Sequence, residues 1–163
     1  MQSTNTKFNN NGLLDSLTGT PAPKIFLDNL SREIARSRRK FQALSIMTIK
    51  IIPPDNSLKI ESAAESYNHN LIAAGQVIKS QMRSGDFFAR IADDGFWVCL
   101  QGNIEDAEKT SSRFTKSLST ITDRNVKENK GFSFLIGLSE WSSNIDPVAW
   151  VCQIDSQYFG QDA

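Results

Sequence analysis

Hydrophobic residues along this chain follow two patterns, a spacing of three to four residues and short continuous runs. The first pattern is typical of helices with one buried face, and the second of buried strands. Together they predict helices over residues 24–40, 58–82, 103–121 and 147–159, and strands over residues 43–52, 87–91, 96–100 and 132–138. In the first helix, Phe26, Leu30 and Ile34 share one face. This order of elements predicts an α+β fold, an antiparallel sheet with helices on one or both faces.

The connection between strands 87–91 and 96–100 has a strong local signal. It reads Ala92-Asp93-Asp94-Gly95 and lies between apolar runs. An Asp-Gly pair in this position predicts a β-hairpin, because glycine tolerates the positive φ that tight hairpin turns require. We therefore expect a positive φ at Gly95, and turn chemistry explains both aspartates without a bound ion.

The length and the polar ends of the chain indicate one domain. A chain of 163 residues can bury a substantial core. Residues 1–12 predict a disordered polar tail, which leaves the domain to residues 13–163. Residues 13–19 predict a short helical turn that ends at Gly19. Residues 36–40 form a basic end to the first helix, which is usually solvated but could contact an acidic partner surface.

Charge and cysteine content narrow the class of protein. Eighteen basic and eighteen acidic residues cancel, so bulk charge favours neither nucleic acid nor an anionic membrane. The apolar runs are too short to span a membrane, and the N-terminus lacks the apolar stretch of a secretory signal. We expect a cytoplasmic protein with Cys99 and Cys152 reduced and buried, His69 exposed and no zinc site. The tryptophans are expected in the core or at an interface: Trp97, Trp141 and Trp150.

Residues 83–96 carry a resemblance to a known family. Arg83-Ser84-Gly85-Asp86 precedes Phe88-Ala89-Arg90 and the turn Ala92-Asp93-Asp94-Gly95-Phe96. This stretch resembles the signature region of the GGDEF family, the diguanylate cyclases that condense two GTP molecules into cyclic di-GMP. Segments similar to the family's occur in order elsewhere: Asp15-Ser16-Leu17-Thr18-Gly19, Leu135-Ile136-Gly137-Leu138 and Ile154-Asp155-Ser156-Gln157-Tyr158-Phe159. The resemblance implies a palm-like fold related to adenylyl cyclases, with a mostly antiparallel five-stranded sheet surrounded by helices.

The signature turn departs from the family pattern. The family turn reads Gly-Gly-Asp/Glu-Glu-Phe, whereas this turn lacks both leading glycines and has Gly95 in place of the glutamate. By the same resemblance, Lys50 stands at a metal-binding aspartate and Ile52 at the next acidic position. An ammonium group there repels the divalent cations that phosphoryl transfer uses, although it could also bind a phosphate. The resemblance therefore implies a domain that is not an enzyme, without catalytic residues, metal or cofactor.

Other substrate contacts of the family are also replaced. The residues that the resemblance places at those positions are Ala22, Pro23, Pro54-Asp55, Asn68 and, near the C-terminus, Asp162. None of these side chains supplies the basic or acidic group that the family has there. The resemblance thus implies loss of nucleotide contacts throughout the synthetic site.

The Arg-x-x-Asp pair upstream of the turn keeps the family pattern. In the family this pair binds cyclic di-GMP at an inhibitory site, the arginine to phosphate or guanine acceptor atoms and the aspartate to guanine N–H groups. Arg83 and Asp86 stand in the same register, and Arg90 could assist or be structural. The alternative is that these residues form a solvated turn without a binding role, since such turns favour the same residue types.

Two functions follow from the resemblance. The first is a catalytically inactive GGDEF domain that acts as a cyclic di-GMP receptor through Arg83 and Asp86, with ligand binding able to drive dimerisation. The alternative is a nucleotide-independent adaptor that binds a protein partner in a signalling pathway. Neither function involves nucleic acid or a membrane segment.

Overall fold

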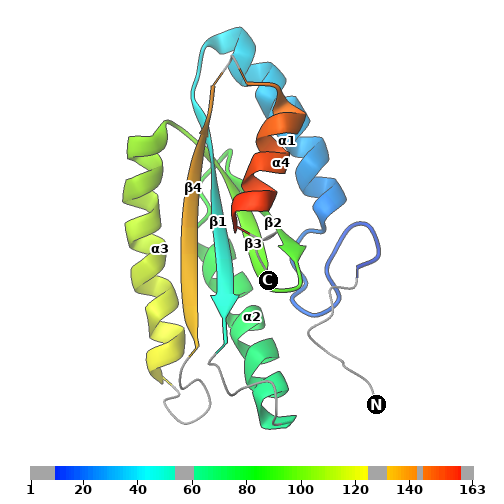
Figure 1. Cartoon of the computed structure of the whole chain (residues 1–163), viewed down its shortest axis with the longest axis vertical. Coiled ribbons are helices and arrows are strands. Elements are labelled where there is room, and N and C mark those ends of the chain that lie inside the picture. Colours follow the sequence, from blue (N-terminus) through cyan, green and yellow to red (C-terminus); the bar gives the residue numbers. More distant parts are fainter. Residues whose placement is uncertain (1–9, 54–60, 125–131, 143–144, 159–163) are drawn as a thin grey trace.

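The computed structural model describes residues 10–53, 61–124, 132–142 and 145–158, and their elements follow the predicted order. These elements are α1 Pro23–Lys40, β1 Leu44–Ile52, α2 Glu61–Gln81, β2 Phe87–Ala92, β3 Gly95–Gln101, α3 Ile104–Arg124, β4 Ser133–Trp141 and α4 Pro147–Tyr158 (Figure 1). Strand β4 extends beyond the predicted residue 138, because Trp141 pairs with Leu44 of β1. None of the helices in these residues is long and apolar enough to cross a membrane.

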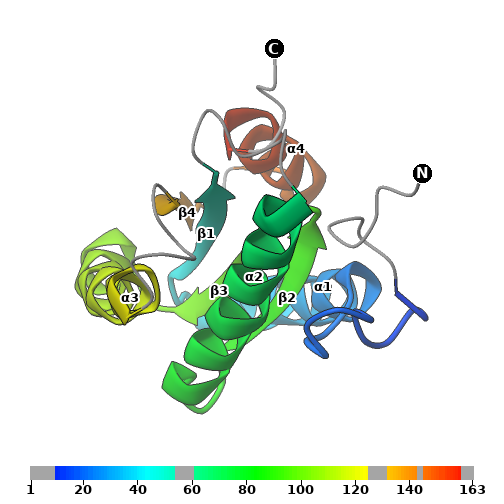
Figure 2. The ribbon, with the colours of Figure 1, turned by 90° about the horizontal axis from the view of Figure 1, so that it is seen from below.

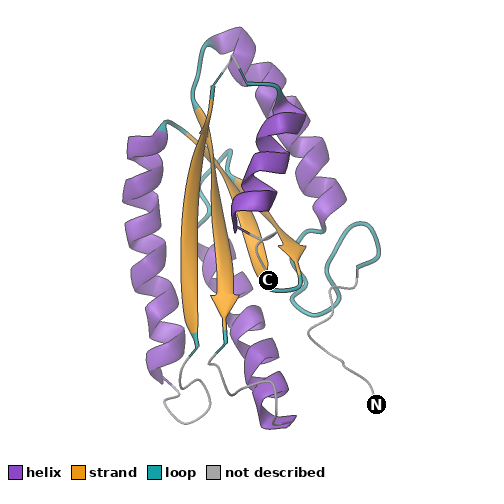
Figure 3. Cartoon of the chain, viewed as in Figure 1, coloured by secondary structure: helices purple, strands orange, loops and turns teal. Residues whose placement is uncertain are grey.

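The described strands form one antiparallel sheet in the order β2-β3-β1-β4 (Figure 3). This sheet has four strands, so the five strands implied by the family resemblance are wrong for the described part of the chain. The residue pattern alone had predicted four. After β4 the chain reaches Pro147, which begins α4. Proline suits the first turn of a helix and cannot donate a sheet hydrogen bond, so this segment favours a helix over a further strand.

Helices cover both faces of the sheet, so the central strand β1 is buried on both sides. Met47, Ile49 and Ile51 of β1 belong to a core cluster with residues of α2 and α3, whereas Leu44 and Ile46 pack with residues of α1 and α4. Alternate residues of a strand point to opposite faces, which produces this division. The view along the sheet shows α2 and α3 on one side and α1 and α4 on the other (Figure 2).

The β2–β3 hairpin is confirmed, but the reason given for its turn is wrong. Ala92 pairs with Gly95, so Asp93 and Asp94 form a two-residue turn. Positive φ values in the described residues occur at Phe41 and at four glycines, and Gly95 is not among these. Gly95 instead lies in the ladder of β3, where it also pairs with Lys50 of β1. Gly95 is therefore extended, and the chain reverses at Asp93 and Asp94, next to the bulge between Arg90 and Ala92.

The prediction that both thiols are buried is half wrong. Cys99 lies in the core beneath α1, but Cys152 is exposed on α4. Trp150 and Ile154 of α4 are buried, and residues two positions away lie on the opposite side of a helix. The tryptophans are all buried, as predicted, and His69 is exposed.

The segment before α1 forms a turn with isolated bridges, Asn10 to Asp15 and Leu14 to Pro21, in place of the predicted helical turn. The carboxylate of Asp15 accepts hydrogen bonds from the backbone N–H and the hydroxyl of Thr18, at 2.8 and 2.6 Å. These local bonds compete with helix formation. Residues 1–9 of the expected tail lie outside the described residues.

Candidate functional site

Both residues of the Arg-x-x-Asp pair line a pocket of about 500 Å³ between the end of α2 and the start of α3. Asp86 holds the loop in shape, because its carboxylate oxygens accept the backbone N–H groups of Arg83 at 3.3 Å and Gln101 at 3.2 Å. A carboxylate has about four acceptor positions, so two such bonds leave acceptor capacity for a ligand. Gly85, at φ 92°, supplies the left-handed conformation that the loop needs between these residues.

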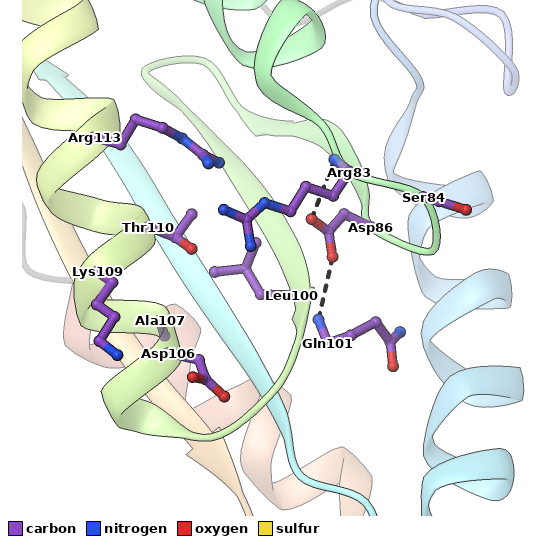
Figure 4. Close-up of a pocket in the computed structure, with 10 residues that line it drawn as sticks. All are labelled: Arg83, Ser84, Asp86, Leu100, Gln101, Asp106, Ala107, Lys109, Thr110 and Arg113. Carbon is purple, nitrogen blue, oxygen red and sulfur yellow. Dashed lines mark hydrogen bonds between the residues drawn. The ribbon is translucent and has the colours of Figure 1, made fainter.

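Helix α3 provides the other wall of this pocket, with Asp106, Lys109, Thr110 and Arg113. Asn103 caps the start of helix α3, since its Oδ1 accepts the N–H of Asp106 at 2.9 Å. In the close-up, Arg83 and Arg113 extend from the two walls toward the same space (Figure 4). Three cationic side chains thus line the pocket against two carboxylates.

Sequence reasoning missed the α3 side of the site. Lys109 and Arg113 are spaced four residues apart, so they lie on one face of the helix. Nothing in the local sequence connects the polar face of this helix with Arg83. The polar spacing at residues 106, 109, 110 and 113 is the signal that could have suggested a binding surface.

Gln81, the last residue of α2, connects the two walls of the pocket. Its side-chain oxygen accepts a hydrogen bond from Arg113 Nε at 3.2 Å, and its backbone oxygen accepts one from the other end of the guanidinium at 3.4 Å. Its side-chain amide also donates to the hydroxyl of Ser117. Gln81 therefore orients Arg113 from a position two residues before Arg83.

Arg90 is held away from this pocket. Its side chain is fully buried, and one guanidinium nitrogen donates to both carboxylate oxygens of Asp15 at 3.0 and 3.1 Å. Its remaining groups donate to the carbonyl oxygens of Ala92 and Asp93 at 3.3 and 2.8 Å. These bonds fasten the signature turn to the segment before α1, and Arg90 is not among the residues that line the pocket.

The signature turn contains an ion pair at the position where the resemblance implies metal ligands. Lys50 Nζ lies 3.5 Å from Asp94 Oδ2, and both side chains are mostly buried. The carbonyl oxygen of Asp94 also accepts the N–H of Ile51 at 2.8 Å, which ties the turn to β1. An ammonium group in contact with the remaining carboxylate neutralises it and repels a divalent cation. These residues do not fit the metal site of a cyclase.

The structure describes some of the residues that stand at the family's other substrate contacts. Ala22 is buried before α1, and Pro23 begins that helix. Asn68 lies buried on α2. Pro54, Asp55 and Asp162 lie outside the described residues.

The family model described as diguanylate cyclase, GGDEF domain, matches residues 13–159. The chain belongs to the GGDEF family. DgcS, a diguanylate cyclase of Shewanella oneidensis, is 30% identical to it over 113 residues, which make up 66% of this chain and 36% of DgcS. This GGDEF chain therefore spans little more than a third of the length of that relative.

Solved structures agree in fold. The diguanylate cyclase SiaD of Pseudomonas aeruginosa, solved in complex with its activator SiaC, matches with a TM-score of 0.72 and 21% identity, over 88% of this chain and 55% of SiaD. The coiled coil and GGDEF domain of DgcB from Caulobacter crescentus, in complex with c-di-GMP, matches with a TM-score of 0.65 and 14% identity, over 89% of this chain and 80% of that one. At these identities the likeness shows that the GGDEF fold is shared.

Proposed function

We propose that this GGDEF domain is a cyclic di-GMP receptor that no longer synthesises the molecule. The observation that carries the proposal is the pocket of about 500 Å³ in which Arg83 and Asp86 face Arg113. Its size falls in the range of small-molecule sites, about 300–1,000 Å³. A GGDEF domain that keeps the Arg-x-x-Asp pair in such a pocket is expected to bind the messenger.

The polar groups of the pocket match the chemistry of a cyclic dinucleotide. Arginine guanidinium groups bind phosphate oxygens or the acceptor edge of guanine through paired N–H donors, so Arg83 and Arg113 suit either part of the ligand. The carboxylate of Asp86 suits the N–H donors of guanine. The excess of cations over carboxylates in the lining favours an anionic ligand.

The relatives support this choice of ligand. The DgcB domain was solved in complex with c-di-GMP. A second microbial GGDEF domain, whose interaction with the same cyclic dinucleotide has been described, matches with a TM-score of 0.66. We carry the ligand over to this chain because its own residues line a pocket with the required donors and acceptors.

The proposed loss of synthesis rests on the signature turn. Phosphoryl transfer in this family's reaction needs metal ions to neutralise the charge on the phosphates. Here Lys50 contacts Asp94, and Gly95 replaces the glutamate. Purified, nucleotide-free protein should form no cyclic di-GMP from GTP with Mg²⁺ or Mn²⁺. Product above the level of the Asp94→Ala variant would overturn this part of the proposal.

Calorimetric titration with cyclic di-GMP, GTP and GDP tests the receptor. We expect cyclic di-GMP alone to bind, and Arg83→Ala or Asp86→Ala to weaken it. A charge-assisted contact contributes about 1.5–3 kcal/mol, so each variant should lose roughly ten- to a hundred-fold in affinity. Arg32→Ala, an exposed arginine of α1, is the matched control and should bind as the wild type does.

The alternative outcomes are distinct. Absence of binding in the wild type would contradict the receptor and leave the nucleotide-independent adaptor as the function. Equal binding by the wild type and both pocket variants would keep a receptor but place its site elsewhere.

A further inference from the structure

Phe41, directly after α1, combines two unfavourable features. Its backbone is left-handed, at φ 53° and ψ 40°, and its side chain is 97% exposed. In the described part of the chain it is the one residue other than glycine with a positive φ. Its N–H and that of Gln42 both donate to the carbonyl oxygen of Ser37, which closes the helix in the usual left-handed manner.

The fold itself gives no reason for a phenylalanine at this position. Helices commonly end this way on glycine, because a Cβ atom crowds the backbone in the left-handed region. The ring of Phe41 is almost fully exposed, so it buries too little apolar surface to offset this backbone strain. Strain and exposure together indicate a residue kept for a contact outside its own domain.

A second pocket lies beside this residue. It has a volume of about 360 Å³ and is lined by Gln42, Ala43, Gln101, Gly102, Asn103 and Asp106. Phe41 directly precedes Gln42 and Ala43, two of the residues that line the pocket. The end of α1, the start of β1 and the start of α3 lie at the same end of the molecule (Figure 1), and residues of the α1–β1 loop, of the β3–α3 connection and of the start of α3 line this pocket.

Both signs of charge are present around this pocket. Arg38, Arg39 and Lys40 form the last turn of α1, and Glu105 and Asp106 the first turn of α3. A uniformly acidic partner or an anionic membrane would meet the two carboxylates as well as the cations. A surface with a protruding aromatic ring, an adjacent pocket and adjacent opposite charges is complementary to a copy of itself.

We propose that this surface joins two copies of the chain about a two-fold axis. Phe41 of each copy enters the pocket at Gln42 and Asp106 of the other, and the basic end of each α1 meets the acidic start of the other α3. A two-fold interface uses the same patch on both copies, so each ring and each charge is used twice. The phenylalanine then supplies the buried aromatic anchor that such interfaces favour.

This dimer keeps the signature turns apart. Leu44 pairs with Gln101 at the Phe41 end of the sheet, whereas Lys50 pairs with Gly95 at the other end. The two turns therefore lie on the far sides of the dimer. The inference does not depend on ligand binding, and it is tested on protein freed of nucleotide, so that its failure is separate from failure of the receptor.

Sedimentation equilibrium from low micromolar to near-millimolar protein measures the association. The wild type should show a reversible monomer–dimer equilibrium. Phe41→Gly and Phe41→Asn should weaken it at least tenfold, and Val148→Ala, which trims an exposed apolar side chain on α4, should leave it unchanged. A wild type that remains monomeric, or a Phe41→Gly variant that dimerises normally, would overturn the proposal.

Charge exchange tests the two-fold geometry. Arg39→Glu and Asp106→Lys should each weaken self-association, since each puts like charges together at both contacts. A mixture of these two variants should form a heterodimer, because position 39 of each copy then meets an opposite charge at position 106 of the other. Absence of a heterodimer in the mixture would contradict the pairing.

Thermal melts separate a contact role from a role in the fold. At low micromolar concentration, where the wild type is monomeric, Phe41→Gly should raise the melting temperature by roughly 2–4 °C through relief of backbone strain. A lower melting temperature would show that Phe41 stabilises its own domain.

Phe41-dependent capture by phosphatidylserine vesicles without dimerisation would replace the second copy with a membrane surface and overturn the proposal.

Discussion

The carboxylate of Asp15 and the guanidinium of Arg90, 75 residues apart in sequence, form a fully buried ion pair at 3.0 Å. Arg90 also donates to the carbonyl oxygens of Ala92 and Asp93, and Asp15 accepts from Thr18. The pair therefore joins the segment before α1 to the signature turn. It fixes the turn by buried polar contacts and needs no ligand to do so.

Asp15→Ala should destabilise the domain by about 3–5 kcal/mol, because it leaves a buried guanidinium without its counter-charge. Chemical denaturation measures the change, with Asp28→Ala, at an exposed position of α1, as the control. Replacement of both partners by apolar residues, Asp15→Leu with Arg90→Met, should recover much of the loss. A single variant as stable as the wild type would show that the pair is not structural.

Lys50→Asp should create affinity for Mn²⁺, because it exchanges the cation beside Asp94 for a second carboxylate. Electron paramagnetic resonance of Mn²⁺ measures the free ion. Lys50→Met removes the ammonium without adding a ligand and should bind far less tightly. Gly95→Glu alone should restore neither metal binding nor synthesis, since Lys50 remains. Tight Mn²⁺ binding by the wild type would contradict our interpretation of the ion pair.

Gln81→Ala should weaken cyclic di-GMP binding by several-fold, because Arg113 loses the side-chain acceptor of its Nε and keeps only the bond to the backbone oxygen of residue 81. Titration calorimetry measures the effect. In the Arg113→Ala background the same change should cost little, since Gln81 acts through that arginine. Additive losses in the double variant would mean that Gln81 contributes independently of Arg113.

The two thiols should differ in reactivity. Burial, with help from the negative charges of Glu33 and Asp86, raises the pKa of the Cys99 thiol well above its ordinary value. Cys152 is exposed. A thiol reagent at mildly alkaline pH should modify Cys152 rapidly and Cys99 only after unfolding. Mass spectrometry identifies the modified residue, and early modification of Cys99 would contradict its burial.

The same pKa shift has a consequence for stability. The folded protein keeps the Cys99 proton at pH values where the unfolded chain releases it. The protonated Cys99 thiol therefore contributes fully to the free energy of unfolding below its ordinary pKa, and this contribution is lost as the pH rises from there through the raised pKa of the folded state. Cys99→Ala should reduce the pH dependence of the unfolding free energy in that alkaline range.

Local patterns were sufficient for the elements of the fold. The spacing of Phe26, Leu30 and Ile34 predicted α1 and its buried face, and the hydrophobic spacing over residues 103–121 predicted α3. These features depend on residues within a turn or two of one another. Local patterns failed where other contacts overrode them, at the predicted helical turn of residues 13–19 and at the Asp-Gly dipeptide that the sheet holds extended, whereas the fifth strand came from resemblance alone.

The sequence by itself determined the order of the elements, the family and the register of Arg83 and Asp86, because all three depend on short-range spacing. Only the tertiary structure decided what those residues meet. Arg113 reaches the pocket from α3, Lys50 contacts Asp94 from the neighbouring strand, and Arg90 turns inward to Asp15. The physical reason is that each of these contacts joins segments far apart in the chain. Such contacts follow from how helices pack on a twisted sheet, which residue spacing does not encode.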